Sequence, residues 1–232
     1  MIHWLHSGDP FPPLTEALAE PNGLLAAGGE LSTAFLLDAY RHGIFPWFSP
    51  GQPLLWWSPD PRMVLFPREL KVVRSLAKVL RNRAYEVRAD TAFRRVIGAC
   101  AEPRATQDGT WISAEMIAAY CALHELGYAH SIETWIDGEL AGALYGVALG
   151  RMFYGESMFT RAPDASKIAL VHLTRQLARW NFGMIDCQMH TPHLASLGAR
   201  EVPRADFMRN LQELVNYSRE PGRWTLDLDL ID

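Results

Sequence analysis

The sequence has few of the features that mark secreted, membrane-spanning or disulfide-rich proteins. It contains three cysteines in 232 residues, and an odd number of widely spaced cysteines does not fit a disulfide framework, which favours a reducing compartment. Its first residues have neither the positive charge nor the apolar run of a secretory signal. No apolar run reaches the roughly 18 residues of a membrane span. These absences predict a cytoplasmic protein that does not enter a membrane.

The sequence motifs of several large enzyme classes are also missing. There is no serine nucleophile elbow, phosphate-binding P-loop or Gly-x-Gly-x-x-Gly dinucleotide motif. Cys187, His190 and His193 have a spacing that occurs in zinc sites, but a continuing strand would direct Cys187 and His190 to opposite faces, and no fourth ligand is near. We therefore expect neither a metal nor a cofactor. The missing motifs favour group transfer between two bound substrates.

Prolines and aromatic residues are concentrated in residues 1–61. The chain has 15 prolines and eight tryptophans, and prolines at high density interrupt regular structure and fix a rigid path. We predict a small, irregular N-terminal domain over residues 1–61, with one short helix capped by Ser32, and a second domain over residues 62–232. The tryptophans either fill the core of a lobe too small for an ordinary core or bind a ligand, and composition leaves both open.

A basic segment follows this lobe, although the whole chain carries a net charge of −4. A helix over residues 71–81 would place an arc of basic side chains opposite an apolar side. A solvated helix face usually mixes charges of both signs, because like charges four residues apart repel. The one-signed arc therefore indicates a polyanion such as a phosphate backbone, with a merely solvated face as the alternative. The arc consists of Lys71, Arg74, Lys78 and Arg81.

The rest of the chain predicts an α+β domain with a mostly antiparallel sheet. The first two expected strands are joined by the two-residue turn Asp137-Gly138. A long apolar helix is expected to begin at Asp164 or Ser166 and to end at Gly183. A meander followed by a strand-helix-strand unit is an α+β layer architecture. The expected strands cover residues 130–136, 139–147, 152–159 and 184–188.

Polar side chains lie on strands that otherwise look buried. Alternation along residues 184–190 places Asp186, Gln188 and His190 on one face. A carboxylate in a partly dry site has a raised proton affinity and an adjacent amide can orient it, which suits a general base for an amine. The alternative for Asp186 is that it caps loop amides. Glu156, on another strand, pairs either with a cationic substrate group or with an arginine of the protein.

The chain contains five separated motifs: Gly43-Ile44-Phe45-Pro46-Trp47-Phe48, Trp56-Trp57-Ser58-Pro59-Asp60-Pro61-Arg62, Gly155-Glu156-Ser157-Met158-Phe159, Ile185-Asp186-Cys187-Gln188 and Ser196-Leu197-Gly198-Ala199-Arg200-Glu201. Together they resemble one enzyme family, leucyl/phenylalanyl-tRNA protein transferase, over nearly the whole chain. The resemblance implies a monomeric enzyme of the bacterial cytoplasm. It implies transfer of Leu or Phe, with Met as a further candidate, from charged leucyl-tRNA or phenylalanyl-tRNA to proteins that begin with Arg or Lys, which marks those proteins for degradation. It also implies a C-terminal domain shaped like the acetyltransferase superfamily.

The resemblance assigns roles to particular residues of this chain. Asp186 and Gln188 match a pair that handles protons, and Glu156 matches a residue near the reacting amine. Trp47 and Trp111 match aromatic residues that hold the terminal adenosine of the tRNA, where stacking contributes roughly 1–3 kcal/mol per base. The basic arc at Lys71, Arg74, Lys78 and Arg81 falls where the family binds the acceptor stem. The pocket for the transferred side chain would be lined by Leu144, Phe153, Leu170, Leu173 and Leu177.

Two other functions compete with this interpretation. An acyl-CoA transferase of the same superfamily would need a glycine-rich pyrophosphate loop before its long helix, and residues 160–166 hold no such loop. A nucleic-acid-binding module without catalysis would explain the basic arc and the tryptophans. It would leave Glu156, Asp186 and Gln188 on apolar strands unexplained.

Overall fold

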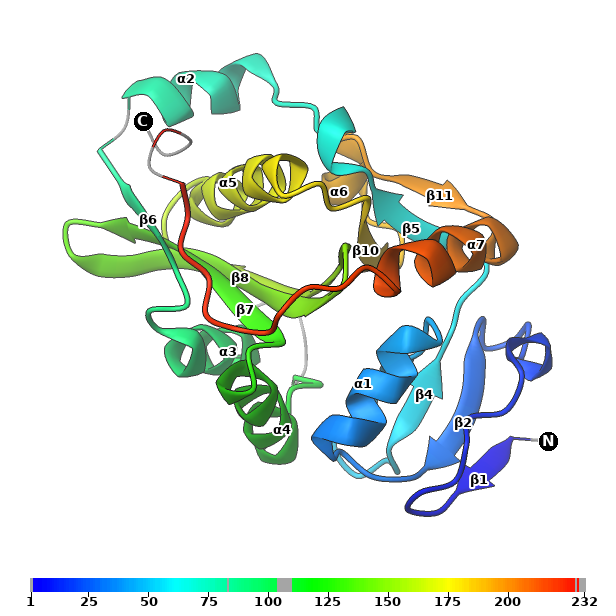
Figure 1. The fold of residues 1–232 in the computed structure, drawn as a ribbon. Coiled ribbons are helices and arrows are strands. Elements are labelled where there is room, and N and C mark those ends of the chain that lie inside the picture. Colours follow the sequence, from blue (N-terminus) through cyan, green and yellow to red (C-terminus); the bar gives the residue numbers. More distant parts are fainter. Residues whose placement is uncertain (1, 83, 104–109, 228, 230–232) are drawn as a thin grey trace.

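The computed structural model describes residues 2–82, 84–103, 110–227 and 229, which build two β-sheets and the helices around them (Figure 1). The smaller sheet has the order β1-β2-β4-β3 and the larger one β11-β5-β10-β9-β8-β7-β6. The small sheet contains β1 (His3–Leu5), β2 (Leu24–Gly28), β3 (Phe45–Pro46) and β4 (Leu55–Trp57). The large sheet contains β5 (Arg62–Leu65), β6 (Glu86–Ala89), β7 (Ala129–Ile136), β8 (Glu139–Leu149), β9 (Met152–Thr160), β10 (Met184–Gln188) and β11 (Arg200–Val202).

The helices connect and cover these strands. The helices are α1 (Thr33–Arg41), α2 (Arg74–Asn82), α3 (Phe93–Ala101), α4 (Ala114–Glu125), α5 (Ala165–Arg179), α6 (Pro192–Ser196) and α7 (Arg204–Val215), with two 3-10 turns, η1 (Leu14–Glu16) and η2 (Pro67–Glu69).

The N-terminal lobe is more regular than its prolines predicted. Its aromatic segments pair as short strands, and Pro46 lies on the edge strand β3, where its missing N–H removes no bond from the interior of the sheet. The predicted cap of α1 is confirmed, because the Ser32 side chain accepts a hydrogen bond from the Phe35 N–H at 3.2 Å. The lobe therefore contains a four-stranded sheet and a capped helix rather than irregular chain.

The large sheet confirms the predicted α+β architecture. Strands β7, β8 and β9 form an antiparallel meander, and β10 returns to the sheet parallel to β9 after α5. Helix α5 ends at Arg179, before the predicted Gly183, because Asn181 takes the left-handed conformation (φ 59°) that reverses the chain. Gly183 instead packs closely against α7: a Cβ there would lie 2.4 Å from Leu214 Cδ2, so a larger residue would require the Leu214 side chain to move.

Helices cover both faces of the large sheet (Figure 1). On one face, α5 packs on alternate sheet residues such as Leu144 and Phe153. On the other face, α3 and α4 pack on the intervening residues, such as Tyr145 and Tyr154. This second cluster continues through Tyr40 of α1 into the N-terminal lobe, so the two sheets share one hydrophobic core.

The basic helix begins later than the sequence predicted. Helix α2 starts at Arg74, and Lys71 lies in the preceding segment, where its backbone N–H donates to the Leu197 carbonyl at 2.9 Å. That bond fixes the segment against the loop after α6, so Lys71 does not continue the helical arc. The side chains of Lys71, Arg74, Lys78 and Arg81 are nevertheless all exposed.

A C-terminal strap, residues 218–227, crosses the molecule after α7 (Figure 1). Trp224 of this strap is buried, and the centroid of its ring lies 3.8 Å from that of the His130 ring, with the two rings stacked. The backbone N–H of Trp224 donates to Asp90 Oδ2 at 2.7 Å. Asp227 exchanges hydrogen bonds with the Gln176 amide on α5. The strap therefore joins the ends of β7 and α5, which no local pattern in the sequence predicted.

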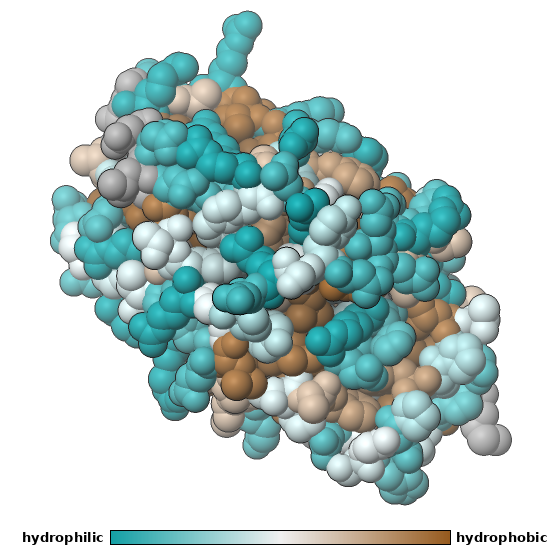
Figure 2. Space-filling model, viewed as in Figure 1, coloured by the Kyte–Doolittle hydropathy of each residue, from teal (hydrophilic) through white to brown (hydrophobic). Residues whose placement is uncertain are grey.

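The face shown in Figure 2 is mostly hydrophilic, with hydrophobic residues in separate patches between hydrophilic ones. Among the residues that the structure describes, no helix is long and apolar enough to cross a membrane.

Candidate functional site

The central cavity opens where two strands of the large sheet separate. Strands β9 and β10 pair from Met152 to Tyr154 and from Met184 to Asp186, and they diverge beyond these residues. Gly155 and the following residues of β9 then line a cavity of about 680 Å³ together with the end of β10. Its volume lies within the usual range for ligand pockets.

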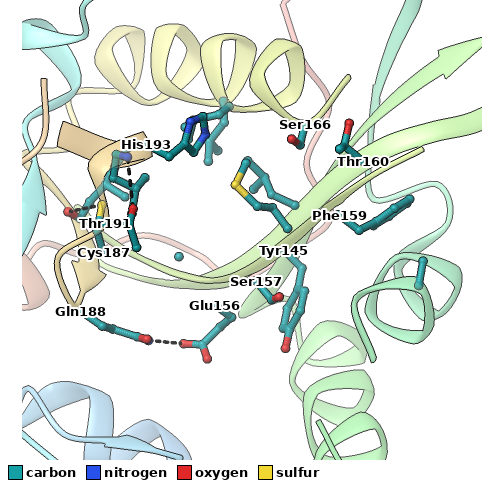
Figure 3. A pocket seen from close by; sticks show the side chains of 18 of the residues that line it. Tyr145, Glu156, Ser157, Phe159, Thr160, Ser166, Cys187, Gln188, Thr191 and His193 are labelled. Carbon is teal, nitrogen blue, oxygen red and sulfur yellow. Dashed lines mark hydrogen bonds between the residues drawn. The ribbon is translucent and has the colours of Figure 1, made fainter. Parts of the chain in front are cut away.

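One side of the cavity is apolar and lies against α5 (Figure 3). Four of the five residues predicted for the side-chain pocket line it, and Leu177 does not. Leu177 is fully buried one turn further along α5, inside the packed cluster behind the cavity. The apolar lining residues include Leu144, Phe153, Met158, Leu170, Leu173 and Ile185.

Glu156 lies on the opposite wall and accepts hydrogen bonds from three side chains. Tyr40 and Tyr120 donate to its two carboxylate oxygens at 2.7 and 2.9 Å, and their hydroxyl oxygens lie 2.5 Å apart. The Gln188 amide donates to Glu156 Oε1 at 3.3 Å, as Figure 3 shows. Neither tyrosine was predicted from the sequence. Of the two partners predicted for Glu156, the protein arginine is not seen among the described residues, where its hydrogen-bond partners are hydroxyl and amide groups.

Burial raises the pKa of Glu156 from 4.5 to about 7, against the opposing effect of the two tyrosine hydroxyls. The remaining exposed surface of Glu156 faces the cavity. Burial also raises the pKa values of Tyr40 and Tyr120 well above 10, so both hydroxyls keep their protons at neutral pH. Glu156 is therefore a carboxyl group that can take up or release a proton near pH 7 at the cavity wall.

Asp186 lies behind the cavity rather than on its wall. It is fully buried, and Arg62 donates to its two oxygens at 2.8 and 2.6 Å. Asp186 Oδ1 also accepts the backbone N–H of Gln188 at 2.8 Å, which is the capping contact that the sequence left open. The strand register shifts between these two residues, and Gln188 has φ 62°, so the regular alternation expected along residues 184–190 is interrupted.

The cysteine and histidines near β10 do not form a metal site. Burial raises the pKa of Cys187 far above neutrality, so its sulfur remains a thiol rather than a nucleophilic thiolate. Within residues 2–82, 84–103, 110–227 and 229, no three His, Cys, Asp or Glu side chains come together as metal ligands.

Comparison with known proteins identifies the family of this chain. Residues 64–212 match the model of leucyl/phenylalanyl-tRNA protein transferase, and residues 29–60 match the model of its N-terminal domain. The chain belongs to this family. It is 64% identical over 227 residues to the leucyl/phenylalanyl-tRNA–protein transferase of Nitrosomonas europaea, covering 98% of this chain and 96% of that one. It is 68% identical over 217 residues to the one of Thiobacillus denitrificans, covering 94% and 95%. It is thus an aminoacyltransferase.

Solved structures of other proteins resemble it more distantly. A GCN5-related N-acetyltransferase from Kribbella flavida is 13% identical, with a TM-score of 0.39 over 79% of this chain and 66% of that one.

Two tryptophans that the family resemblance assigns to the tRNA adenosine lie outside the cavity lining. Trp47 follows β3, is 39% exposed, and packs edge-on against Trp57 with ring centroids 5.6 Å apart. Trp111 is partly buried just before α4 and packs against the shared core. Their role toward adenosine stays a prediction. The exposed face of Trp47 gives it room for a stacked base, whereas Trp111 has less.

The position of Leu177 makes a prediction that separates packing from substrate contact. We expect Leu177→Ala to lower the free energy of unfolding by about 2–5 kcal/mol, because it removes a fully buried side chain, and to leave the KM for charged leucyl-tRNA unchanged. Leu173→Ala is the matched variant: Leu173 is as deeply packed but lines the cavity, so it should also raise that KM. Equal KM changes in the two variants would contradict this division.

Proposed function

We propose that this aminoacyltransferase moves Leu or Phe, with Met as a further candidate, from charged tRNA to the α-amine of proteins that begin with Arg or Lys, and thereby marks those proteins for degradation. The single observation that carries the proposal is a cavity with an apolar wall on one side and the ionisable Glu156 on the other, in a chain of this family. The apolar wall suits an isobutyl or benzyl side chain. The carboxyl group suits an amine.

The chemistry requires positioning and a proton acceptor. The neutral α-amine of the acceptor attacks the ester carbonyl of the aminoacyl-tRNA, an amide bond forms, and the ribose oxygen leaves with a proton. In our proposal Glu156 takes the proton that the amine loses and passes a proton to the leaving ribose oxygen, with Gln188 orienting the carboxylate, since both lie at the cavity. The buried ion pair with Arg62 favours a supporting role for Asp186 over direct contact with the amine. An ester is an activated donor, so correct placement supplies much of the acceleration.

We propose that the protein acts as a monomer. We place the reaction in the bacterial cytoplasm, where charged tRNA and new acceptor proteins meet.

One transfer assay tests the proposal directly. Leucyl-tRNA charged with radioactive Leu is incubated with the protein and a peptide that begins with Arg, and the product is sequenced. We expect a new N-terminal Leu, and no transfer to a matched peptide that begins with Glu. Transfer of an acetyl group from acetyl-CoA to the same peptide, without transfer from charged tRNA, would instead support the acyl-CoA transferase. Tight tRNA binding without transfer would support a binding module.

The exposed basic residues before and on α2 should supply phosphate contacts. We expect the triple change of Lys71, Arg74 and Lys78 to Glu to weaken binding of leucyl-tRNA and to reduce the slope of log Kd against log salt by about 2–3, since each lost phosphate contact lowers that slope by about 1. Filter binding between 50 and 200 mM salt measures it. The control is Arg209→Glu on α7, an exposed arginine away from this helix. An unchanged slope in the triple variant would show that these residues form a merely solvated face and make no phosphate contacts.

A further inference from the structure

Arg62 occupies a buried junction behind the cavity. It is fully buried at the start of β5, and it is not among the residues that line the cavity. Besides its two bonds to Asp186, its Nη1 donates to the Gly43 carbonyl at 3.1 Å. Its guanidinium also lies 4.8 Å from the ring centroid of Phe45 and 4.6 Å from that of Phe207. One side chain therefore joins the large sheet, the N-terminal lobe and α7.

The Asp186 carboxylate connects Arg62 to a residue of the cavity wall, Gln188. The oxygen that binds Arg62 Nε, Oδ1, also accepts the Gln188 N–H at 2.8 Å. Gln188 has φ 62°, a left-handed conformation that residues other than glycine seldom adopt. The bond to Asp186 compensates for this cost, and the turn brings the Gln188 amide to Glu156. The order of contacts is thus Arg62, Asp186, Gln188, Glu156.

We propose that Arg62 is a positioning residue for aminoacyl transfer, which holds Asp186 so that Gln188 keeps the turn that directs its amide at Glu156. This inference rests on the proposed function, in which Glu156 lies next to the reacting amine. Arg62 touches neither the cavity nor the exposed basic residues of α2. Its loss should therefore slow the chemical step and leave the binding of both substrates unchanged.

Arg62→Lys is the decisive variant. Lysine keeps the positive charge, but a single ammonium group lacks the planar fork that binds both carboxylate oxygens and the Gly43 carbonyl together. Single-turnover transfer of Leu from charged leucyl-tRNA to a peptide that begins with Arg should slow at least tenfold at saturating concentrations. The Kd for leucyl-tRNA and the KM for the peptide should stay within twofold of the wild-type values.

Arg204→Lys is the matched control. Arg204 Nη1 donates to the Ser58 carbonyl at 2.6 Å, so it also links α7 to the segment before β5, but it has no contact with Asp186. Its transfer rate should match that of the wild type. A wild-type rate for Arg62→Lys, or a parallel loss of tRNA affinity, would overturn the positioning role. A wild-type protein that transfers nothing to the peptide would instead refute the proposed function.

A pair of variants at Asp186 keeps the inference testable even if Arg62→Lys does not fold. Asparagine retains an oxygen that can accept the Gln188 N–H, whereas alanine does not. If Asp186 acts by holding Gln188, Asp186→Asn should transfer Leu at least tenfold faster than Asp186→Ala, with both proteins folded by circular dichroism. Equal rates for the two variants would overturn the inference.

Discussion

Replacing Glu156 by Gln should slow single-turnover transfer of Leu by about 10²–10⁴-fold, the usual contribution of a general base. Glutamine has nearly the same shape: its amide oxygen can accept from one tyrosine hydroxyl, and its amide nitrogen can donate to the other. The loss therefore reports the missing proton acceptor rather than a collapsed wall. The measurement is quench-flow transfer from charged leucyl-tRNA to a peptide that begins with Arg. The Kd for leucyl-tRNA should change little.

The transfer rate should depend on pH, because Glu156 acts as a proton acceptor only when it is ionised. Glu156 must be ionised to accept a proton, and its pKa is about 7. The wild-type rate should therefore fall as the pH drops below about 7, in addition to the loss caused by protonation of the acceptor amine. The rate of the Glu156→Gln variant should fall with pH only through protonation of the acceptor amine. Identical profiles for the two proteins would count against Glu156 as the acceptor.

A second acidic residue of the cavity provides the control. Glu102 also lines the cavity, but it is exposed and paired with Arg161 at 2.6 Å. Glu102→Gln should keep both the rate and the pH profile of the wild type.

The same pKa shift has a consequence for stability. Folding raises the pKa of Glu156, so the native state favours the protonated form. Its contribution to stability is therefore fully present below pH 4.5 and is lost as the pH rises from about 4.5 to about 7. Glutamine cannot ionise, and chemical denaturation should show that the variant lacks this decline. A wild-type protein whose stability rises over this pH range relative to the variant would contradict the sign.

The other large effect is expected on the stability of the folded protein. Trp224→Ala should lower the free energy of unfolding by about 3–5 kcal/mol, because it removes a buried aromatic ring. The ring packs against His130, Trp180 and Phe182, and its loss leaves the C-terminal strap without its main apolar contact. Urea denaturation followed by circular dichroism measures the change.

Trp4→Ala is the matched control, since Trp4 on β1 is 62% exposed. It should change stability by no more than about 0.5 kcal/mol. If the two substitutions changed the free energy of unfolding equally, the burial of Trp224 would not be what stabilises the strap.

Local patterns predicted much of the fold correctly. The meander, its two-residue turn at Asp137-Gly138, the long helix and the returning strand are all present. These features depend on side-chain alternation and turn residues a few positions apart, which the sequence displays directly. Errors arose where a distant contact overrides a local pattern. Lys71 is held by the Leu197 carbonyl, and α2 begins three residues later.

The candidate site was only partly visible for the same reason. Glu156 and Gln188 stood out as polar residues on apolar strands, and the structure brings them into contact. Tyr40 and Tyr120 resemble ordinary core aromatics on helices, because the partner that gives them a role is 116 and 36 residues away. Leu177 shares the apolar periodicity of Leu173, and only its place one turn further along α5 puts it in the core rather than at the cavity.

The sequence by itself determined the family, the α+β order of elements and the presence of acid and amide groups on β9 and β10, since these depend on residue identity and short-range spacing. The tertiary structure decided which carboxylate faces the cavity. Asp186 and Glu156 are equally conspicuous in the sequence, but Arg62, 124 residues from Asp186, binds both oxygens of that side chain. Among the described residues, Glu156 accepts hydrogen bonds from neutral donors, so burial raises its pKa and leaves it at the cavity as an ionisable group.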